Sequence, residues 1–361
     1  MRRKYLVSAL TLSLFIFSVD TYVALAQDTT PSETATPSTA ARSSALSVLE
    51  SPVTKLKGPI EAGPPLLAEG ETATADFAYG TFERGWYLTA LALAIPLAEV
   101  GDTSAHTLVG VLYETGYGIA QDKAKAASWY ELASSQNDPA AAQRLAQFYL
   151  LGTGVEQDKK RAADLFEIAA AAGNPAAKYN LAIIYQEGEG RPYNEKKARE
   201  LLREAADLND PEAQYSLGLS YLEGLGGAID AGQGAFWLGR AARRGHVSAQ
   251  VYYGILRFQG KGVEPDQEEA ADWFERAATA GNPVAMNRLA RIYAYGKGRS
   301  LDPVAAAGWH YVARTLGISD LQLDGFAESL DEETLSAARK KAEQYSATLL
   351  PPGTDPGAGS P

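Results

Sequence analysis

The feature that most constrains this chain is a stretch from residue 102 to residue 317, which lines up as six rows of 36 residues without a gap. A repeat of fixed length indicates that the chain folds as a series of similar units, each packed against the next. The rows begin at Asp102, Asp138, Asn174, Asp210, His246 and Asn282. The chemistry of each aligned column therefore predicts the structure of every unit.

The first columns predict a helix at the start of each row. Five rows begin with Asp or Asn, whose side chains cap the first backbone N–H groups of a helix, and His246 is the exception. Pro follows in four rows and suits the first helical position, where its missing N–H has no partner. An Ala column, a large apolar column and a Gly or Ala column follow at the spacing of one helix face. The small column would let a neighbouring helix come close.

The later columns predict a tight turn and a second helix. Every row has a Gly-x-Gly sequence, which permits positive φ and a reversal of the chain. Asp or Asn stands four residues after the second Gly, as a second helix cap. A bulky column comes next, at Trp129, Leu165, Leu201, Trp237, Trp273 and Trp309. Each row closes with Gly or Asn, so every row is predicted to be a helical hairpin, and the stacked hairpins an α-solenoid.

A family resemblance follows from these columns. The row NDPEAQYSLGLSYLEGLGGAIDAGQGAFWLGRAARRG, residues 209–245, resembles the Sel1-like repeat, a relative of the tetratricopeptide repeat. The resemblance implies an all-α fold, a right-handed α-solenoid, and a family made up mostly of adaptors and scaffolds that bind protein segments along a concave face. Secreted relatives with a proposed penicillin-directed activity carry a Cys pair in each repeat. This chain has no Cys, which argues against transferring that activity.

The resemblance also implies a set of partner-binding residues. By analogy with tetratricopeptide grooves, first-helix residues beside the small column should line the concave wall. They are Gln143, Gln147, Tyr179, Gln186, Tyr215, Asn287 and Arg291. Such side chains can hydrogen-bond an extended backbone and offer apolar contact. The alternative is that the tyrosines pack along the helices and the glutamines are solvated.

The residues that could carry chemistry predict no catalytic, cofactor or metal site. His106, His246 and His310 lie in different rows or columns, and neither His246 nor His310 has a paired ligand four residues later. The Gly-x-Gly pairs lack the third Gly and the Lys-Ser/Thr of phosphate-binding loops. Four of the five tryptophans, Trp129, Trp237, Trp273 and Trp309, share a column typical of core, although an aromatic peptide-binding cage is an alternative. We therefore predict that the protein is not an enzyme and needs no cofactor.

The charge of the chain limits its partners. The formal net charge is −11, so the chain has no overall electrostatic footprint for nucleic acid. We predict a protein or peptide partner and no nucleic acid.

The first 26 residues resemble a secretory signal peptide. A basic start at residues 2–4 precedes an apolar run at residues 5–19, and Ala24-Leu25-Ala26 has the small-x-small form of a cleavage site. We expect a mature chain that starts at Gln27, has no transmembrane segment and is periplasmic. An uncleaved anchor is the alternative, although the apolar run is short beside the roughly 20 residues of a membrane span.

The remaining segments complete the predicted domain organisation. Residues 27–71 are polar and predict a disordered linker. Residues 72–101 predict an N-terminal capping hairpin, with a kink or a late helix start at Pro96. Residues 318–347 predict C-terminal capping helices, with a capping box that begins at Ser329. Residues 348–361 are rich in Pro and Gly and predict a disordered tail.

Together these features predict a non-enzymatic scaffold or adaptor of the bacterial periplasm, which binds a partner on the concave solenoid face. Envelope or exopolysaccharide regulation is the setting that the resemblance implies. One alternative is a protein that binds or modifies cell-wall glycan, which would need exposed aromatic platforms and paired carboxylates. Another is a spacer without a partner.

Overall fold

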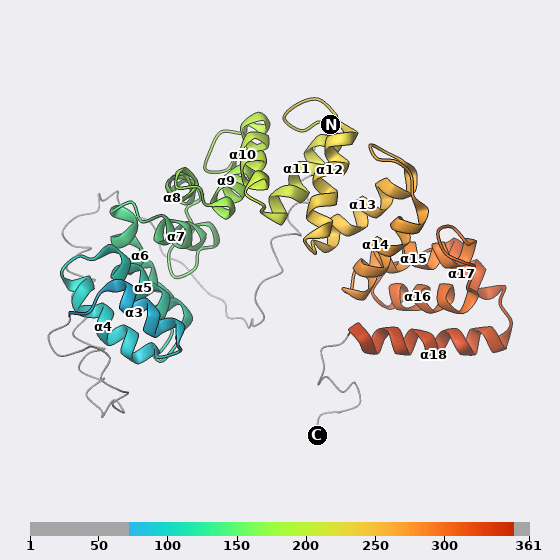
Figure 1. Ribbon diagram of the computed structural model, residues 1–361, viewed down its shortest axis with the longest axis horizontal. Coiled ribbons are helices and arrows are strands. Elements are labelled where there is room, and N and C mark those ends of the chain that lie inside the picture. Colours follow the sequence, from blue (N-terminus) through green and yellow to red (C-terminus); the bar gives the residue numbers. More distant parts are fainter. Residues whose placement is uncertain (1–71, 350–361) are drawn as a thin grey trace, which may run out of the picture. The chain divides into compact units, whose positions relative to one another are not determined.

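The computed structural model describes residues 72–349, which form sixteen helices and no strand (Figure 1). The predicted signal peptide at residues 1–26, the predicted linker at 27–71 and residues 350–361 of the predicted tail lie outside the described residues. The first two residues of that tail, 348–349, are helical, so the predicted start of the tail is wrong. Within residues 72–349, no helix is both long enough and apolar enough to cross a membrane.

Each of the six repeats contributes two helices of 13 residues. The first helices are α5 (Thr103–Thr115), α7 (Pro139–Leu151), α9 (Pro175–Glu187), α11 (Pro211–Glu223), α13 (Val247–Gln259) and α15 (Pro283–Tyr295). The second helices are α6 (Lys123–Ser135), α8 (Lys159–Ala171), α10 (Glu195–Asp207), α12 (Ala231–Arg243), α14 (Gln267–Thr279) and α16 (Pro303–Thr315). Each helix from α5 to α16 packs against its neighbours in the chain, so the all-α solenoid is confirmed.

The five predicted Asp and Asn caps are confirmed, and His246, the exception among the rows, also caps its helix. The Asp138 side chain accepts the backbone N–H of Ala141 at 2.6 Å, and the equivalent residue does the same in the other rows. Each first helix ends at a left-handed Gly, with φ between 65° and 75°. The turn is closed by a backbone hydrogen bond from the second cap, such as Asp122 N–H to Tyr113 C=O at 2.9 Å. The same bond recurs in every row, which explains the fixed loop length.

The repeated small and bulky columns form the core. All six residues of the Ala column have no exposed surface. Gly110, in the small column, faces Tyr130 of the second helix, and a Cβ at residue 110 would lie 2.5 Å from that ring. The bulky column is buried too, from Trp129 at 2% exposure to Leu165 at 8%. The prediction that small residues allow close helix packing is therefore confirmed.

The second Gly of each turn has a role between repeats that the turn alone did not predict. Gly262 lies against the start of α12 in the preceding repeat, and a Cβ at residue 262 would be 2.0 Å from the Ala231 carbonyl oxygen. Gly298 lies in the same way against Gln267 at the start of α14. The contact joins each turn to the preceding second helix, so this column sets the spacing between repeats.

Helices also lie on both sides of the repeats. The hairpin of α3 (Ala75–Glu83) and α4 (Tyr87–Glu99) packs against α5. Helix α4 continues through Pro96, so the predicted late start is wrong.

After the last repeat, α17 (Leu321–Glu328) contacts α15 and α16, while α18 (Glu332–Leu349) packs along α16. The Trp309 and Tyr345 rings stack at 3.8 Å in this contact. The capping box predicted at Ser329 is wrong, because Asp331 accepts the N–H of Thr334 at 2.8 Å and Ser329 bonds back to Phe326.

Candidate partner-binding surface

The seven predicted groove residues all belong to first helices. Gln143 and Gln147 are on α7, Tyr179 and Gln186 on α9, Tyr215 on α11, and Asn287 and Arg291 on α15. Asn287 is buried and the other six are half-buried. We call the non-core side chains of these helices the first-helix surface; besides the seven predicted residues it includes Tyr252, Ile255 and Arg288.

The glutamines of this surface differ in their surroundings. Gln143 and Gln147 make no side-chain hydrogen bond with any residue between 72 and 349. The Oε1 atom of Gln186 is buried and has no hydrogen-bond partner in the same part of the chain. The Gln143 and Gln147 amides remain available to a partner, whereas the Gln186 Oε1 atom is covered by the protein, and the predicted role of all three residues stays a prediction.

The two predicted tyrosines link consecutive first helices. Burial raises the pKa of Tyr179 to about 12, and its hydroxyl lies near Ser216 of α11. Burial also raises the pKa of Tyr215, whose ring contacts that of Tyr252 of α13 edge-on, with centroids 5.8 Å apart. These contacts support the alternative that the tyrosines pack between helices. Tyr252 itself is 41% exposed, so it is the aromatic group of this pair that a partner can reach.

His246 joins the same aromatic cluster. Its ring stacks on Tyr215, with centroids 4.4 Å apart and planes 22° apart. Its Nδ1 accepts the N–H of Ala249 at 3.0 Å, and its Nε2 lies 3.1 Å from a carboxylate oxygen of Glu212. Both ring nitrogens are occupied, so His246 acts as a helix cap and a packing residue.

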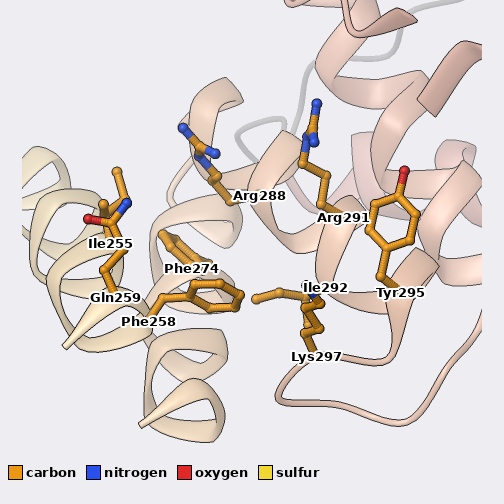
Figure 2. A pocket seen from close by; sticks show the side chains of 9 residues that line it. All are labelled: Ile255, Phe258, Gln259, Phe274, Arg288, Arg291, Ile292, Tyr295 and Lys297. Atoms are coloured by element: carbon orange, nitrogen blue, oxygen red, sulfur yellow. The ribbon is translucent and has the colours of Figure 1, made fainter. Parts of the chain in front are cut away.

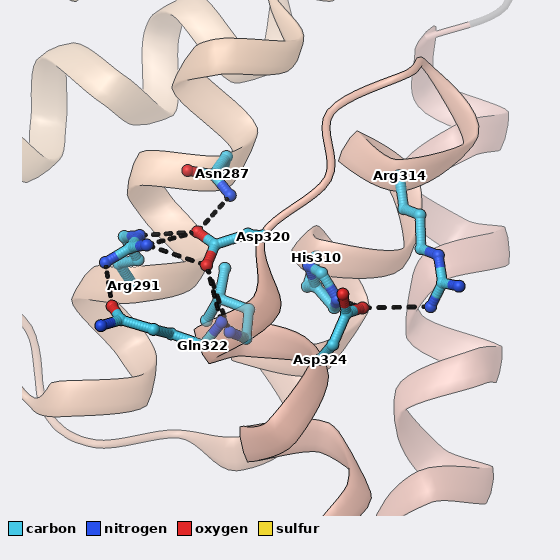
Figure 3. Close-up of polar contacts among 8 residues, drawn as sticks. Asn287, Arg291, His310, Arg314, Asp320, Gln322 and Asp324 are labelled. Carbon is cyan, nitrogen blue, oxygen red and sulfur yellow. Dashed lines mark hydrogen bonds and ion pairs between the residues drawn. The ribbon is translucent and has the colours of Figure 1, made fainter.

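Asn287 and Arg291 bind a residue of the same chain, as Figure 3 shows. The Arg291 guanidinium donates to both carboxylate oxygens of Asp320, at 2.7 and 2.8 Å, and Asn287 donates to the same carboxylate at 2.9 Å. Burial of Asp320 would raise its pKa, but these hydrogen bonds outweigh burial and hold the pKa below its usual value. The two predicted residues therefore fix the start of α17.

A pocket of about 200 Å³ opens between α13 and α15 (Figure 2). Its apolar lining comes from Ile255 and Phe258 of α13, Phe274 of α14, and Ile292 and Tyr295 of α15. Phe274 and Ile292 are almost fully buried, so they form a fixed floor. Its volume is small beside the roughly 300–1,000 Å³ of small-molecule sites, so it suits one large side chain.

The polar lining of this pocket is cationic. Arg288, Arg291 and Lys297 contribute to the lining, together with Gln259, and no carboxylate does. In Figure 2 the guanidinium groups of Arg288 and Arg291 extend to the same side of the pocket. Arg291 is neutralised by Asp320, whereas the Arg288 and Lys297 side chains form no ion pair within residues 72–349. An acidic chain thus has a local positive site on its first-helix surface.

Sequence reasoning found Arg291 in this pocket but missed Arg288, Lys297 and Phe258. Phe258 had the appearance of an ordinary apolar position at the end of a helix. The sequence did contain a signal. Arg144 and Arg288 occupy the same column, but the column of Glu114, which pairs with Arg144, has Phe258 in the row before Arg288. The facing residues can be identified only after the stacking of the repeats is known.

The structure also places the tryptophans and histidine that the sequence offered for an aromatic platform or a metal site. Trp129, Trp237, Trp273 and Trp309 are between 2% and 6% exposed, so they cannot form an aromatic platform on the surface. Within residues 72–349, no group of three His, Asp or Glu side chains has an arrangement that could hold a metal ion. His310 is buried and its Nε2 lies 2.9 Å from Asp324.

Comparison with solved structures supports the solenoid. A Sel1 repeat protein from Oxalobacter formigenes aligns with a TM-score of 0.59 and 22% identity, over 79% of this chain and all of the other. A protective antigen of uropathogenic Escherichia coli with an SLR fold aligns with a TM-score of 0.53 and 24% identity, over 80% of this chain and 74% of the other. Both likenesses concern the fold alone.

No curated protein sequence matches the chain at a significant level. The sequence profile of the Sel1 repeat, however, matches six consecutive segments: 103–138, 139–174, 175–210, 211–246, 247–282 and 283–317. These segments have the predicted period and together span more than half of the chain. The chain therefore belongs to the Sel1 repeat family.

Proposed function

We propose that this protein is a non-enzymatic adaptor of the bacterial periplasm that binds a partner protein or peptide on its first-helix surface. Sel1 repeats are in general protein-interaction modules, which supports the class of function. The predicted signal peptide supports the location. The first-helix surface would be the concave face that the family resemblance implies, in an envelope or exopolysaccharide pathway.

The observation that carries the proposal is a continuous strip across α11, α13 and α15. Tyr252 and Ile255 are three residues apart on α13, so they lie on one helix face. Tyr252 contacts Tyr215 of α11, while Ile255 lines the pocket beside Arg288 of α15. The strip offers aromatic, aliphatic and cationic groups, and interface hot spots are enriched in Tyr and Arg.

Capture from envelope extracts tests the proposal. The bait is the full chain, compared with a variant in which Gln143, Gln147 and Tyr252 are replaced by Ala. These residues lie outside the pocket, and their helices are held by other contacts. A matched control carries Ala at Lys160, Lys196 and Asp207, which are exposed on the second helices α8 and α10.

We expect a small set of proteins that bind the chain and the control but are lost from the first-helix variant. Circular dichroism establishes that all three proteins are equally helical. A set of proteins retained by the first-helix variant would place the binding face elsewhere. If no protein is enriched in any sample, the adaptor proposal fails.

A further inference from the structure

An ion pair between the first and second repeats, Arg144 with Glu114, has no counterpart at the pocket. Arg144, six residues after its helix cap, lies 2.8 Å from a carboxylate oxygen of Glu114. Glu114 belongs to the preceding first helix, twelve residues after the cap of its own row. The Tyr130 hydroxyl donates to the same oxygen at 2.5 Å. At this repeat interface the guanidinium is therefore neutralised from within the chain.

The equivalent positions at the pocket are Arg288 and Phe258. Arg288 stands six residues after Asn282, and Phe258 twelve residues after His246, so they match Arg144 and Glu114. An apolar ring has thus replaced the carboxylate. Arg288 is exposed and forms no ion pair with any residue between 72 and 349, unlike Arg144. The fold keeps the cation while the anion has been replaced by an apolar floor.

A second cation, Lys297, adds to the positive charge that Arg288 gives the pocket. Lys297, in the turn after α15, lines the pocket and is also exposed without an ion pair in the described part of the chain. Arg291 adds little net charge, because Asp320 neutralises it. In a chain with a net charge of −11, most of the surface repels an acidic segment. Two unpaired cations beside the pocket would fix where such a segment binds.

The apolar floor restricts what the anion can be attached to. Phe258, Phe274 and Ile292 line the pocket, and its volume of about 200 Å³ has room for one large apolar side chain. A bare inorganic anion would leave this floor exposed to water. A peptide segment can contact both the cations and the apolar floor, because its neighbouring residues can carry a carboxylate and an apolar side chain.

We propose that the pocket between α13 and α15 binds a partner segment in which Asp or Glu stands beside a large apolar residue. The carboxylate pairs with Arg288, Lys297 adds positive charge elsewhere in the lining (Figure 2), and the apolar side chain covers Phe258 and Phe274. This inference rests on the proposed adaptor function and names the chemistry of its partner. It also assigns Arg288 and Phe258 as the residues that determine specificity.

A displayed library of short random peptides, selected on the full chain, tests the inference. Enriched peptides are read by sequencing, then synthesised with a fluorophore and titrated by anisotropy. Each is paired with a copy in which Asp becomes Asn or Glu becomes Gln. We expect enriched peptides with an acidic residue next to Phe, Leu, Ile or Trp, and dissociation constants about tenfold or more higher for the amide copies.

Two pocket variants identify the site. Phe258→Glu supplies the carboxylate that Glu114 supplies to Arg144, so it should abolish binding of the acidic peptides. Arg288→Gln with Lys297→Gln changes only exposed side chains and should raise the dissociation constant about tenfold or more. Lys160→Gln with Lys196→Gln alters the net charge equally on α8 and α10 and should leave it unchanged.

The outcomes separate this inference from the adaptor proposal. Peptides without an acidic preference, or equal binding by the pocket variants, would overturn the acidic-segment site. The absence of any enriched peptide would overturn it as well. In each case the adaptor proposal would still be decided by the envelope capture, whose variant leaves the pocket intact.

Discussion

The Nδ1 atom of His246 accepts the backbone N–H of Ala249 at 3.0 Å, in the position where the other five repeats use Asp or Asn. An imidazole nitrogen can therefore replace a carboxylate or amide oxygen as a helix cap. The substitution also brings an aromatic ring against Tyr215. The helix start of α13 is thus coupled to the aromatic cluster of the first-helix surface.

This double role predicts the effect of two substitutions. His246→Ala removes the cap and the ring stack, so it should lower the free energy of unfolding by about 2 kcal/mol. His246→Asn keeps a capping oxygen and loses only the ring, so it should cost about half as much. Urea denaturation followed by circular dichroism measures both. Equal midpoints for the two variants would show that His246 does not act as a cap.

The second glycines of the turns predict a clash between repeats. In Gly262→Ala the new methyl group would meet the Ala231 carbonyl, whereas in Gly281→Ala it has nothing within 4 Å. Both residues have positive φ, so both variants carry backbone strain of about 1–2 kcal/mol. We expect Gly262→Ala to cost at least about 2 kcal/mol more than Gly281→Ala. Thermal unfolding of the two variants tests this, and similar losses would contradict the close contact.

The Asp320 carboxylate predicts a pH-dependent contribution to stability. Hydrogen bonds from Asn287 and Arg291 hold its folded-state pKa below the usual Asp value of about 4, despite its burial. A lowered folded-state pKa gives stability that is present above the usual pKa and lost as the pH falls through the folded value. Asp320→Asn should therefore cost about 2 kcal/mol at neutral pH, and much less under strongly acidic conditions.

Urea denaturation of the wild-type chain and Asp320→Asn across this pH range measures the difference. Glu328→Gln is the control, because Glu328 is an exposed residue of α17 that forms no ion pair within residues 72–349. A cost for Asp320→Asn that does not change with pH would show that the charge of Asp320 is unimportant.

The first 26 residues predict processing of the chain. We expect the protein recovered from a periplasmic fraction to begin at Gln27, as read by mass spectrometry of its N-terminal peptide. Replacing Ala24 and Ala26 by Phe removes the small residues of the cleavage site and should leave the precursor in the membrane fraction. A native chain that keeps Met1 would contradict the signal peptide.

The repeat columns predicted most of the fold, because each cap and turn depends on residues within a few positions of one another. Asp138 and Gly152, for example, fix the two ends of α7 without help from distant residues. One error at a helix start came from Ser329, where Asp331 lies closer to α18 and caps its first turn instead. The signal peptide, the linker and the tail beyond residue 349 stay predictions.

The candidate site was predicted less completely, because it depends on contacts between rows. Arg291 and Asn287 were predicted to line a groove, but their main partner, Asp320, lies after the last repeat, where the period is lost. The pocket arises from Phe258, which replaces a charged residue of another row. Which residues of two neighbouring repeats face each other depends on how their helices stack. The sequence of one repeat does not contain that information.

Site-specific photo-crosslinking in living cells tests the proposed binding face most directly. A photoreactive phenylalanine analogue replaces Tyr252 on the first-helix surface or, in the control, Lys160 on the second helix α8. We predict that light produces a discrete covalent complex from position 252 and none from position 160. A complex that forms from position 160 but not from position 252 would contradict binding on the first-helix surface.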